Sequence, residues 1–200
     1  MGRTVVFRDL QRDDFPLLAR WLAEPQVARW WNHAYDEESL EKDFGAAVDG
    51  TDPTRLLLAH VDSLEGMPFG LLQHYRFDSY PEYGVELGPL LSVPAGALSI
   101  DYLIGESSCR GMGLGAEMIR AGVSDGWAGH PGSDDVIVPV AAGNHASRRA
   151  LLRAGFREIA WGPLEPDNPI DPPEHVVHGI RRPGLSSRTP TSAASGSRPR

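Results

Sequence analysis

Ser99-Ile-Asp-Tyr-Leu-Ile-Gly-Glu-Ser-Ser-Cys-Arg-Gly-Met-Gly-Leu-Gly-Ala-Glu-Met-Ile-Arg120 is the stretch that decides the fold of this chain. It joins a short apolar run, a polar turn, a loop with glycines at Gly111, Gly113 and Gly115, and a helical pattern. Because glycine has no Cβ, backbone N–H groups in such a loop can approach a phosphate closely, and the unpaired amides of the helix N-terminus add a partial positive charge. The stretch therefore predicts a strand, an anion-binding loop and a helix in succession.

Composition narrows the class of protein. The chain has 200 residues, of which 41% are apolar and 23% charged, and no apolar run reaches the roughly 18 residues typical of a membrane span. These values predict one soluble domain with its own core and no membrane partner. A single cysteine and the lack of a signal-peptide pattern favour a cytoplasmic location. The net charge of −8 disfavours nucleic acid and favours a cationic small molecule.

Hydrophobic periodicity predicts the order of elements. We expect a strand at 4–7, helices at about 15–22 and 36–48, an antiparallel hairpin of 55–61 with 68–77, a strand at 99–104, a helix from 114, a strand at 135–140, a helix at 146–154 and strands at 156–161 and 175–180. This order predicts an α/β (α+β) domain over residues 1–182, with a mixed sheet and helices on both faces.

Three further segments have less regular patterns. Asp13 or Asp14 is expected to cap the first helix, and Pro25 to end it. Residues 78–97 are rich in Pro, Gly and Tyr and predict a long irregular loop. Residues 183–200 contain almost nothing apolar, so we expect them to be disordered.

Three kinds of phosphate loop compete for the glycine-rich segment. A P-loop requires Gly-Lys-Ser/Thr, whereas Gly115 is followed by Ala-Glu, so that interpretation fails. A dinucleotide loop requires G-x-G-x-x-G at the first strand–helix turn, and here both the spacing and the place in the chain differ. The third pattern is R-x-x-G-x-G, which Arg110, Gly113 and Gly115 complete between a strand and a helix.

This loop resembles the acetyl-CoA loop of the GNAT superfamily of N-acetyltransferases, and the resemblance extends over roughly residues 3–181. Its companions follow in order: a strand at 136–140, then Asn144, then Gly155-Phe156. The resemblance implies a mixed, mostly antiparallel central sheet, with a splayed central strand whose backbone binds the pantetheine of acetyl-CoA. The cofactor contacts that it implies are Leu103, Ile104, Arg110, Gly111, Met112, Gly113, Leu114, Gly115 and Asn144. Asn144 also reads simply as a helix N-cap, and the two roles are compatible.

Within the superfamily the chain is most similar to aminoglycoside 6'-N-acetyltransferases. Those enzymes carry a Trp pair, a Gln-x-Tyr strand and an Ile-Asp-Gln-Leu strand whose aspartate is taken as the catalytic base. An ammonium has no lone pair to attack a thioester, so a carboxylate that binds it and takes its proton meets both needs. The resemblance implies Asp101 as the base and, as substrate-binding residues, Trp30, Trp31, Gln73 and Tyr75, to which Glu82 and Glu86 of the long loop are added as candidate amine contacts.

Each of these residues also has a structural interpretation that the sequence leaves open. Asp101 could lie at the wet edge of its strand or pair with an arginine. The Trp pair could be wedged beneath a loop, and Gln73 and Tyr75 could occupy a half-wet strand face. Acids in a long loop are often merely solvated. Seven histidines show no ligand spacing, so no metal site is predicted.

Two positions depart from the family pattern. Many GNAT enzymes have a tyrosine four residues before Gly-Phe to protonate the departing thiolate, and here that residue is Leu151. The aminoglycoside enzymes have an aspartate five residues before the Asn, and here that residue is Pro139. Two alternatives therefore remain beside an aminoglycoside enzyme: an N-acyltransferase acting on a hydroxylysine siderophore precursor, and a non-catalytic acyl-CoA sensor. The oligomeric state, monomer or homodimer, also stays open.

Overall fold

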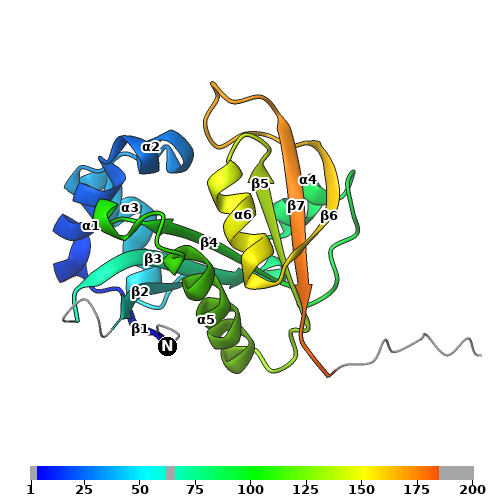
Figure 1. The fold of residues 1–200 in the computed structure, drawn as a ribbon, viewed down its shortest axis with the longest axis horizontal. Coiled ribbons are helices and arrows are strands. Elements are labelled where there is room, and N and C mark those ends of the chain that lie inside the picture. Colours follow the sequence, from blue (N-terminus) through cyan, green and yellow to red (C-terminus); the bar gives the residue numbers. More distant parts are fainter. Residues whose placement is uncertain (1–3, 62–65, 185–200) are drawn as a thin grey trace, which may run out of the picture.

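A seven-stranded sheet forms the centre of the computed structural model, which describes residues 4–61 and 66–184 (Figure 1). The order of strands is β1-β2-β3-β4-β5-β7-β6. All neighbouring pairs are antiparallel except β4 and β5, which are parallel. The strands are β1 (Val5–Asp9), β2 (Arg55–Val61), β3 (Pro68–Arg76), β4 (Leu98–Ile104), β5 (Asp135–Ala141), β6 (Arg157–Pro163) and β7 (Glu174–Arg181). The predicted mixed, mostly antiparallel sheet is confirmed.

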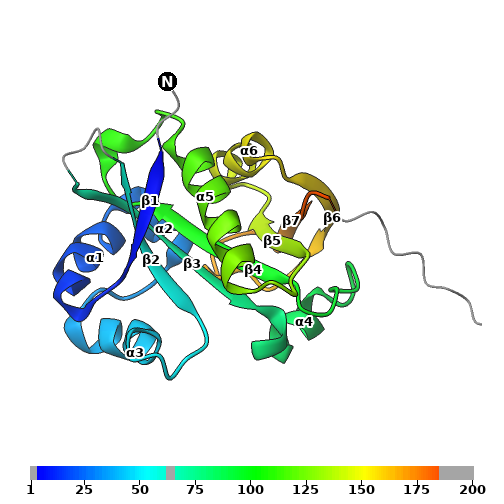
Figure 2. The same ribbon diagram turned by 90° about the horizontal axis from the view of Figure 1, so that it is seen from below.

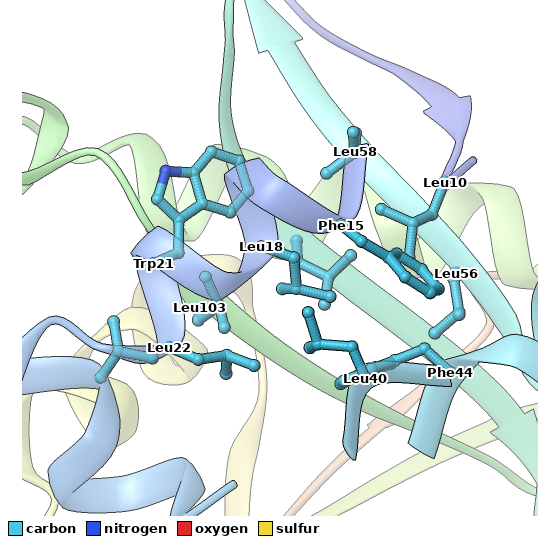
Figure 3. Close-up of a cluster of buried hydrophobic side chains, with 12 residues drawn as sticks. Leu10, Phe15, Leu18, Trp21, Leu22, Leu40, Phe44, Leu56, Leu58 and Leu103 are labelled. Carbon is cyan, nitrogen blue, oxygen red and sulfur yellow. The ribbon is translucent and has the colours of Figure 1, made fainter. Parts of the chain in front are cut away.

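Helices cover both faces of this sheet, as expected (Figures 1 and 2). They are α1 (Phe15–Leu22), α2 (Pro25–Trp31), α3 (Glu37–Val48), α4 (Pro81–Leu87), α5 (Leu114–Gly129) and α6 (His145–Ala154). The apolar sides of α1 and α3 pack on β2, β3 and β4 in a cluster of buried leucines and aromatic residues (Figure 3). The helices α5 and α6 pack on the opposite face of β4 and β5. No helix in the described ranges is long and apolar enough to cross a membrane.

Two helix starts differ in how they are capped. The side chain of Asp36 accepts a hydrogen bond from the Ser39 N–H at 3.0 Å and so caps α3, whose predicted start near residue 36 is confirmed. The cap predicted for α1 at Asp13 or Asp14 is not formed. The Asp14 carboxylate instead accepts from the backbone N–H of Gln11 at 2.9 Å and pairs with Arg8, because a 3₁₀ turn precedes α1.

Two helices occur where the sequence did not predict them. Pro25 begins α2 instead of only ending α1, and Pro81 begins α4 inside the segment 78–97 that we predicted to be an irregular loop. Proline suits the first turn of a helix, because the N–H that it lacks would have no intrahelical partner there. Each of these helices has seven residues and buries only one, Val27 in α2 and Leu87 in α4. Neither sequence therefore shows the helical periodicity of apolar residues that predicts a helix.

The strands β4 and β5 separate soon after they begin. Their only paired residues are Leu98 and Val136, whereas β3 and β4 pair along seven residues. Pro139 lies in the part of β5 that is separated from β4. Ala142 donates its N–H to Glu174 on β7, and the alternation of an antiparallel ladder then turns the nitrogen of Pro139 toward the open side. A proline that lacks an N–H is tolerated at such an edge. The strand predicted at 135–140 is confirmed as β5, but its second half has no paired neighbour on the β4 side.

The end of the chain lies mostly beyond the structure. Of the segment 183–200 that we expect to be disordered, residues from 185 onward fall outside the described ranges.

Candidate active site

A cavity of about 640 Å³ lies in the gap between β4 and β5. Four consecutive residues of β4 line it: Ser99 and Asp101 from the face of α1 to α4, and Ile100 and Tyr102 from the face of α5 and α6. Successive side chains of a strand point to opposite faces. Both faces can open into one cavity because β5 has moved away from β4. The cavity therefore passes through the sheet.

Asp101 lies at the centre of this passage and is only partly exposed. Gln73, its partner across the β3–β4 ladder, donates a hydrogen bond from Nε2 to Asp101 Oδ2 at 3.0 Å. Burial raises the pKa of the Asp101 carboxyl above its ordinary value, the Gln73 hydrogen bond lowers it, and the negative charge of Asp167 raises it again. A carboxylate with a raised pKa is a stronger base than an ordinary aspartate.

The aromatic residues expected at the site all line this cavity. Trp30, Trp31 and Tyr75 contribute to its wall, as does Gln73. Trp31 donates its indole N–H to the carbonyl of Tyr102 on β4 at 3.3 Å, which holds the end of α2 against the separated strand. The structure thus gathers Trp30, Trp31, Gln73, Tyr75 and Asp101 around one space.

Ion pairs and hydrogen bonds fasten α2 to the β6–β7 connection. Arg29 donates to Asp171 at 2.7 Å and lies 4.3 Å from the ring centre of Trp30. Asn32 at the end of α2 donates to the carbonyl of Asp167 at 3.0 Å, and Asn168 donates to the carbonyl of Arg29. This connection and α2 lie side by side (Figure 1), and both contribute residues to the wall of the cavity.

Four carboxylates line the cavity, and the sequence identified only two of them. Glu86 of α4 and Asp101 were predicted, whereas Glu165 and Asp167 of the β6–β7 connection were missed. Glu82, the other predicted acid, lies one turn of α4 before Glu86 and does not line the cavity. Its assignment as a substrate contact is therefore corrected. The connection is rich in proline, and no motif or spacing within it pointed to these two acids.

Two histidines that line the cavity were also missed, His33 after α2 and His175 on β7. The Nδ1 atom of His175 lies 2.8 Å from the Pro173 carbonyl, so this nitrogen carries the proton and Nε2 is free to accept one. Their lone positions in the sequence carried no signal of a site.

The glycine loop joins β4 to α5, as predicted. Gly111 and Gly113 have φ angles of 73° and 84°, a region that favours glycine, and Gly113 is the N-cap of α5. No atom lies within 4 Å of a Cβ built at either position, so the space above the helix N-terminus is open. Open space at a helix N-terminus fits a phosphate group.

Other residues of this loop hold its shape. Arg110 donates to the carbonyls of Ile104 at 3.1 Å and Gly105 at 3.0 Å, so its side chain fastens the loop to the end of β4. Leu114 is buried beneath the loop, whereas Met112 is half exposed. Gly115 lies in the first turn of α5, where a Cβ would be 3.7 Å from that of Ala150 on α6.

The structure corrects one predicted cofactor contact, Leu103. Its side chain is only 5% exposed and packs in the cluster of α1 and α3 (Figure 3). Gly105 donates its N–H to Phe69 on β3, so ladder alternation directs the backbone of Leu103 to β3 as well. The backbone groups of Tyr102 and Ile104 face the gap between β4 and β5 instead. The predicted contact at Leu103 is therefore wrong by one residue.

Asn144 has the predicted cap geometry. Its Oδ1 accepts from the Ser147 N–H at 3.1 Å, which caps α6, and the residue also lines the cavity. At the other end of α6, Gly155 has a φ angle of 106° and ends the helix in the left-handed conformation.

The family model described as the acetyltransferase (GNAT) domain matches residues 10–162. The chain is therefore a GNAT acetyltransferase. This membership agrees with the separated central strands, the R-x-x-G-x-G loop and the strand order described above. It makes the protein an enzyme of the N-acetyltransferase class.

Solved structures share the fold of this acetyltransferase at low sequence identity. The aminoglycoside acetyltransferase AAC(6')-Ib, in complex with paromomycin and acetyl-CoA, is 22% identical, with a TM-score of 0.72 over 90% of this chain and 94% of that one. Aminoglycoside N(6')-acetyltransferase from Legionella pneumophila is 19% identical, with a TM-score of 0.66 over 90% and 94%. Spermidine N-acetyltransferase from Vibrio cholerae, in complex with CoA and spermine, is 13% identical, with a TM-score of 0.67 over 89% and 95%. Among curated protein sequences there is no significant match.

Proposed function

We propose that this GNAT enzyme transfers the acetyl group of acetyl-CoA to a primary amine of a small polycation, and that an aminoglycoside 6'-amine is its acceptor. The observation that carries the proposal is the cavity through the sheet. One side of it has a carboxylate with a raised pKa and further acids, and the other side leads toward an open helix N-terminus. Such a passage can bring an amine and a thioester together from opposite faces.

Acetyl-CoA supplies an acetyl carbon activated as a thioester. The amides of Gly111 to Gly115 at the start of α5 would hold its pyrophosphate, since the space at Gly111 and Gly113 is open and the positive end of the helix lies there. Asn144 and the gap-facing backbone of Ile104 would hold the arm that leads into the cavity. Arg110 keeps the loop in place by its bonds to the end of β4.

The acceptor amine would enter against Asp101. Its carboxylate binds the ammonium form and then takes the proton that frees the nitrogen lone pair. Gln73 orients the carboxylate through the 3.0 Å hydrogen bond, and Trp31 and Tyr75 exclude water around it. Positioning the two reactants together supplies a further part of the rate enhancement.

The acidic rim favours an acceptor with more than one amine. Glu86, Glu165 and Asp167 are exposed at the cavity, where they can bind ammonium groups distant from the reacting one. Aminoglycosides and spermine, which occur in the solved relatives, are polycations of this kind. In this interpretation Glu165 and Asp167 take the part of the aspartate that Pro139 replaces.

A panel of acceptors tests the proposal. The purified protein would be incubated with acetyl-CoA and kanamycin, ribostamycin, spermidine, hydroxylysine or a peptide N-terminus while free thiol is followed, and mass spectrometry would locate the acetyl group. We expect turnover of the aminoglycosides at the 6'-amine. Preference for hydroxylysine would support the siderophore-precursor alternative, and tight CoA binding without thiol release from any amine would support the sensor alternative.

Expression in a sensitive bacterial host extends the test to the cell. If the 6'-amine is the acceptor, the chain should raise the kanamycin concentration that stops growth, and Asp101→Asn should not. A cytoplasmic location, which resistance of this type requires, stays a prediction.

A further inference from the structure

Tyr102 is the residue after Asp101, and the alternation of β4 places it on the opposite side of the same cavity. Its hydroxyl lies 2.6 Å from Oγ of Ser147 in the first turn of α6. Its ring packs against apolar residues of α5 and α6 and is half-buried. Neither the family resemblance nor the proposed chemistry so far uses this phenol.

The reaction requires a hydrogen-bond donor on this side. When an amine attacks a thioester, the C–S bond breaks with its electron pair on sulfur, and the resulting charge must be stabilised. If the amine arrives beside Asp101, the sulfur leaves toward the face of α5 and α6. On that face Leu151 is completely buried and aliphatic, so it has no proton to donate.

Few polar side chains of the described ranges line the cavity there. Ile100, Val138 and Val140 are aliphatic, and the donors on this wall are the Nδ2 group of Asn144, whose Oδ1 caps α6, and the hydroxyls of Ser147 and Tyr102. Of these donors, Tyr102 is the one that β4 itself carries, next to Asp101. The Ser147 hydroxyl can donate to the phenol oxygen, and the phenol O–H then lies 3.4 Å from the Ser147 carbonyl, a long hydrogen bond that a closer acceptor can replace.

We propose that the Tyr102 hydroxyl, held by Ser147, donates a hydrogen bond to the sulfur of CoA as the C–S bond breaks. The inference rests on the proposed use of acetyl-CoA. In the complete step the Asp101 carboxylate first takes the ammonium proton that frees the nitrogen lone pair and passes it to solvent. The nitrogen then bonds to the acetyl carbon, the C–S electron pair passes to sulfur, the carboxylate takes the second nitrogen proton, and the thiolate later takes a proton from solvent. Tyr102 keeps its own proton throughout.

The surroundings of Tyr102 favour hydrogen bonding over proton transfer. Burial raises the pKa of this phenol above its ordinary value. A thiol ionises far more readily than such a phenol, so complete transfer of the phenol proton to the thiolate would be unfavourable. A fixed O–H group that stabilises the charge without ionising is the arrangement that remains.

Titration of the bound CoA thiol tests this inference without any acceptor amine. The thiolate absorbance of saturated protein would be followed against pH, with desulfo-CoA complexes as the blank. In the wild-type protein we expect the thiol pKa to lie below that of free CoA. Tyr102→Phe should raise this pKa by about one unit, which lowers the ratio of thiolate to thiol about tenfold at a given pH. Ser147→Ala should raise it less. Tyr35→Phe, a change at an exposed tyrosine away from the cavity, should leave it unaltered.

Turnover gives the second measurement, with whichever amine proves to be a substrate. Tyr102→Phe should lower kcat about 100-fold and leave the CoA dissociation constant within about twofold. An unchanged thiol pKa in Tyr102→Phe, or a CoA affinity lost in parallel with the rate, would overturn the assignment. Because the titration uses CoA alone, a wrong acceptor would leave its result intact, whereas a protein that binds no CoA would refute the proposed function itself.

Discussion

The two faces of β4 differ in charge although they belong to one strand. On the face of α1 to α4, Asp101 lies among further carboxylates and aromatic rings. On the face of α5 and α6, the cavity has aliphatic residues, the Tyr102–Ser147 pair and the cap of α6. The first face suits a cation and the second an apolar, uncharged chain ending in a thioester.

This difference shows how a sheet can bring two unlike molecules together. Within a continuous sheet the two faces are sealed from each other by the neighbouring strand. Here β5 pairs with β4 only at Leu98 and Val136, so consecutive side chains of β4 meet the same space. The alternation of the strand then separates Asp101, the proposed proton acceptor, from Tyr102, the proposed hydrogen-bond donor to the leaving sulfur.

Loss of the Asp101 charge should reduce activity more than any other change on the acidic face of β4. We expect Asp101→Asn to lower kcat with an aminoglycoside about 100-fold or more, because the amide cannot take the ammonium proton. Steady-state kinetics with thiol detection measure the rate, and calorimetry measures CoA binding, which should be unchanged. A rate within threefold of the wild type would remove Asp101 from the role of base.

The loop behind the other face is tested at Gly113. Its φ angle of 84° is strained for alanine, so Gly113→Ala should displace the first amides of α5 and raise the KM for acetyl-CoA about tenfold. The KM for the amine should not change. Gly129→Ala is a matched control, because this glycine ends the same helix without a positive φ and with open space around it. Equal effects of the two variants would contradict a role for the loop in binding.

Recognition of a distant ammonium is tested at Asp167. Replacement of this rim acid by Asn should raise the KM of a polyamine or aminoglycoside about fivefold and leave the KM of a simple monoamine unchanged, since only a second ammonium reaches the rim. Glu82→Gln serves as the control for charge alone, because this exposed acid lies outside the cavity. If both changes act equally, the effect is one of net charge.

The smallest effect concerns stability. Burial raises the pKa of Asp101 above 3.8, so the folded protein binds this proton more tightly than the unfolded chain does, and stability falls as pH rises from about 3.8 through the folded pKa. Asp101→Asn should therefore raise the Tm by about 2–4 °C at pH 7 and by progressively less as the pH falls toward 4. Calorimetric Tm values of both proteins between pH 4 and pH 8 measure this. A gain that is independent of pH would contradict a buried, ionised carboxylate.

Some features of the site could be predicted because they depend on local geometry. The cap at Asn144 and the helix end at Gly155 occur where the sequence placed them, and the positive φ at Gly113 agrees with a glycine at that position. Gln73 and Asp101 were each predicted as site residues through the family resemblance, and the structure adds the hydrogen bond between them.

Other features depend on residues far apart in sequence. Glu165 and Asp167 reach the cavity only because the β6–β7 connection is fastened to α2 by the Arg29–Asp171 pair, 142 positions apart. The exclusion of Leu103 from the site depends on its packing against α1. No local pattern reports either event, and the short helices α2 and α4 bury too little to show a periodicity.

The sequence by itself determined the family, because the R-x-x-G-x-G loop and its companions are residue types at fixed spacings. It also predicted the anion-binding loop, for which backbone geometry requires glycine, and, through the family resemblance, Asp101 as the base. Only the tertiary structure decided that both faces of β4 open into one cavity and that Tyr102 lies opposite Asp101. The physical reason is the separation of β4 from β5. Strand pairing is a contact between segments that are distant in sequence. The one sign of its loss in the sequence is Pro139, which lacks the N–H that a strand paired on the β4 side would donate.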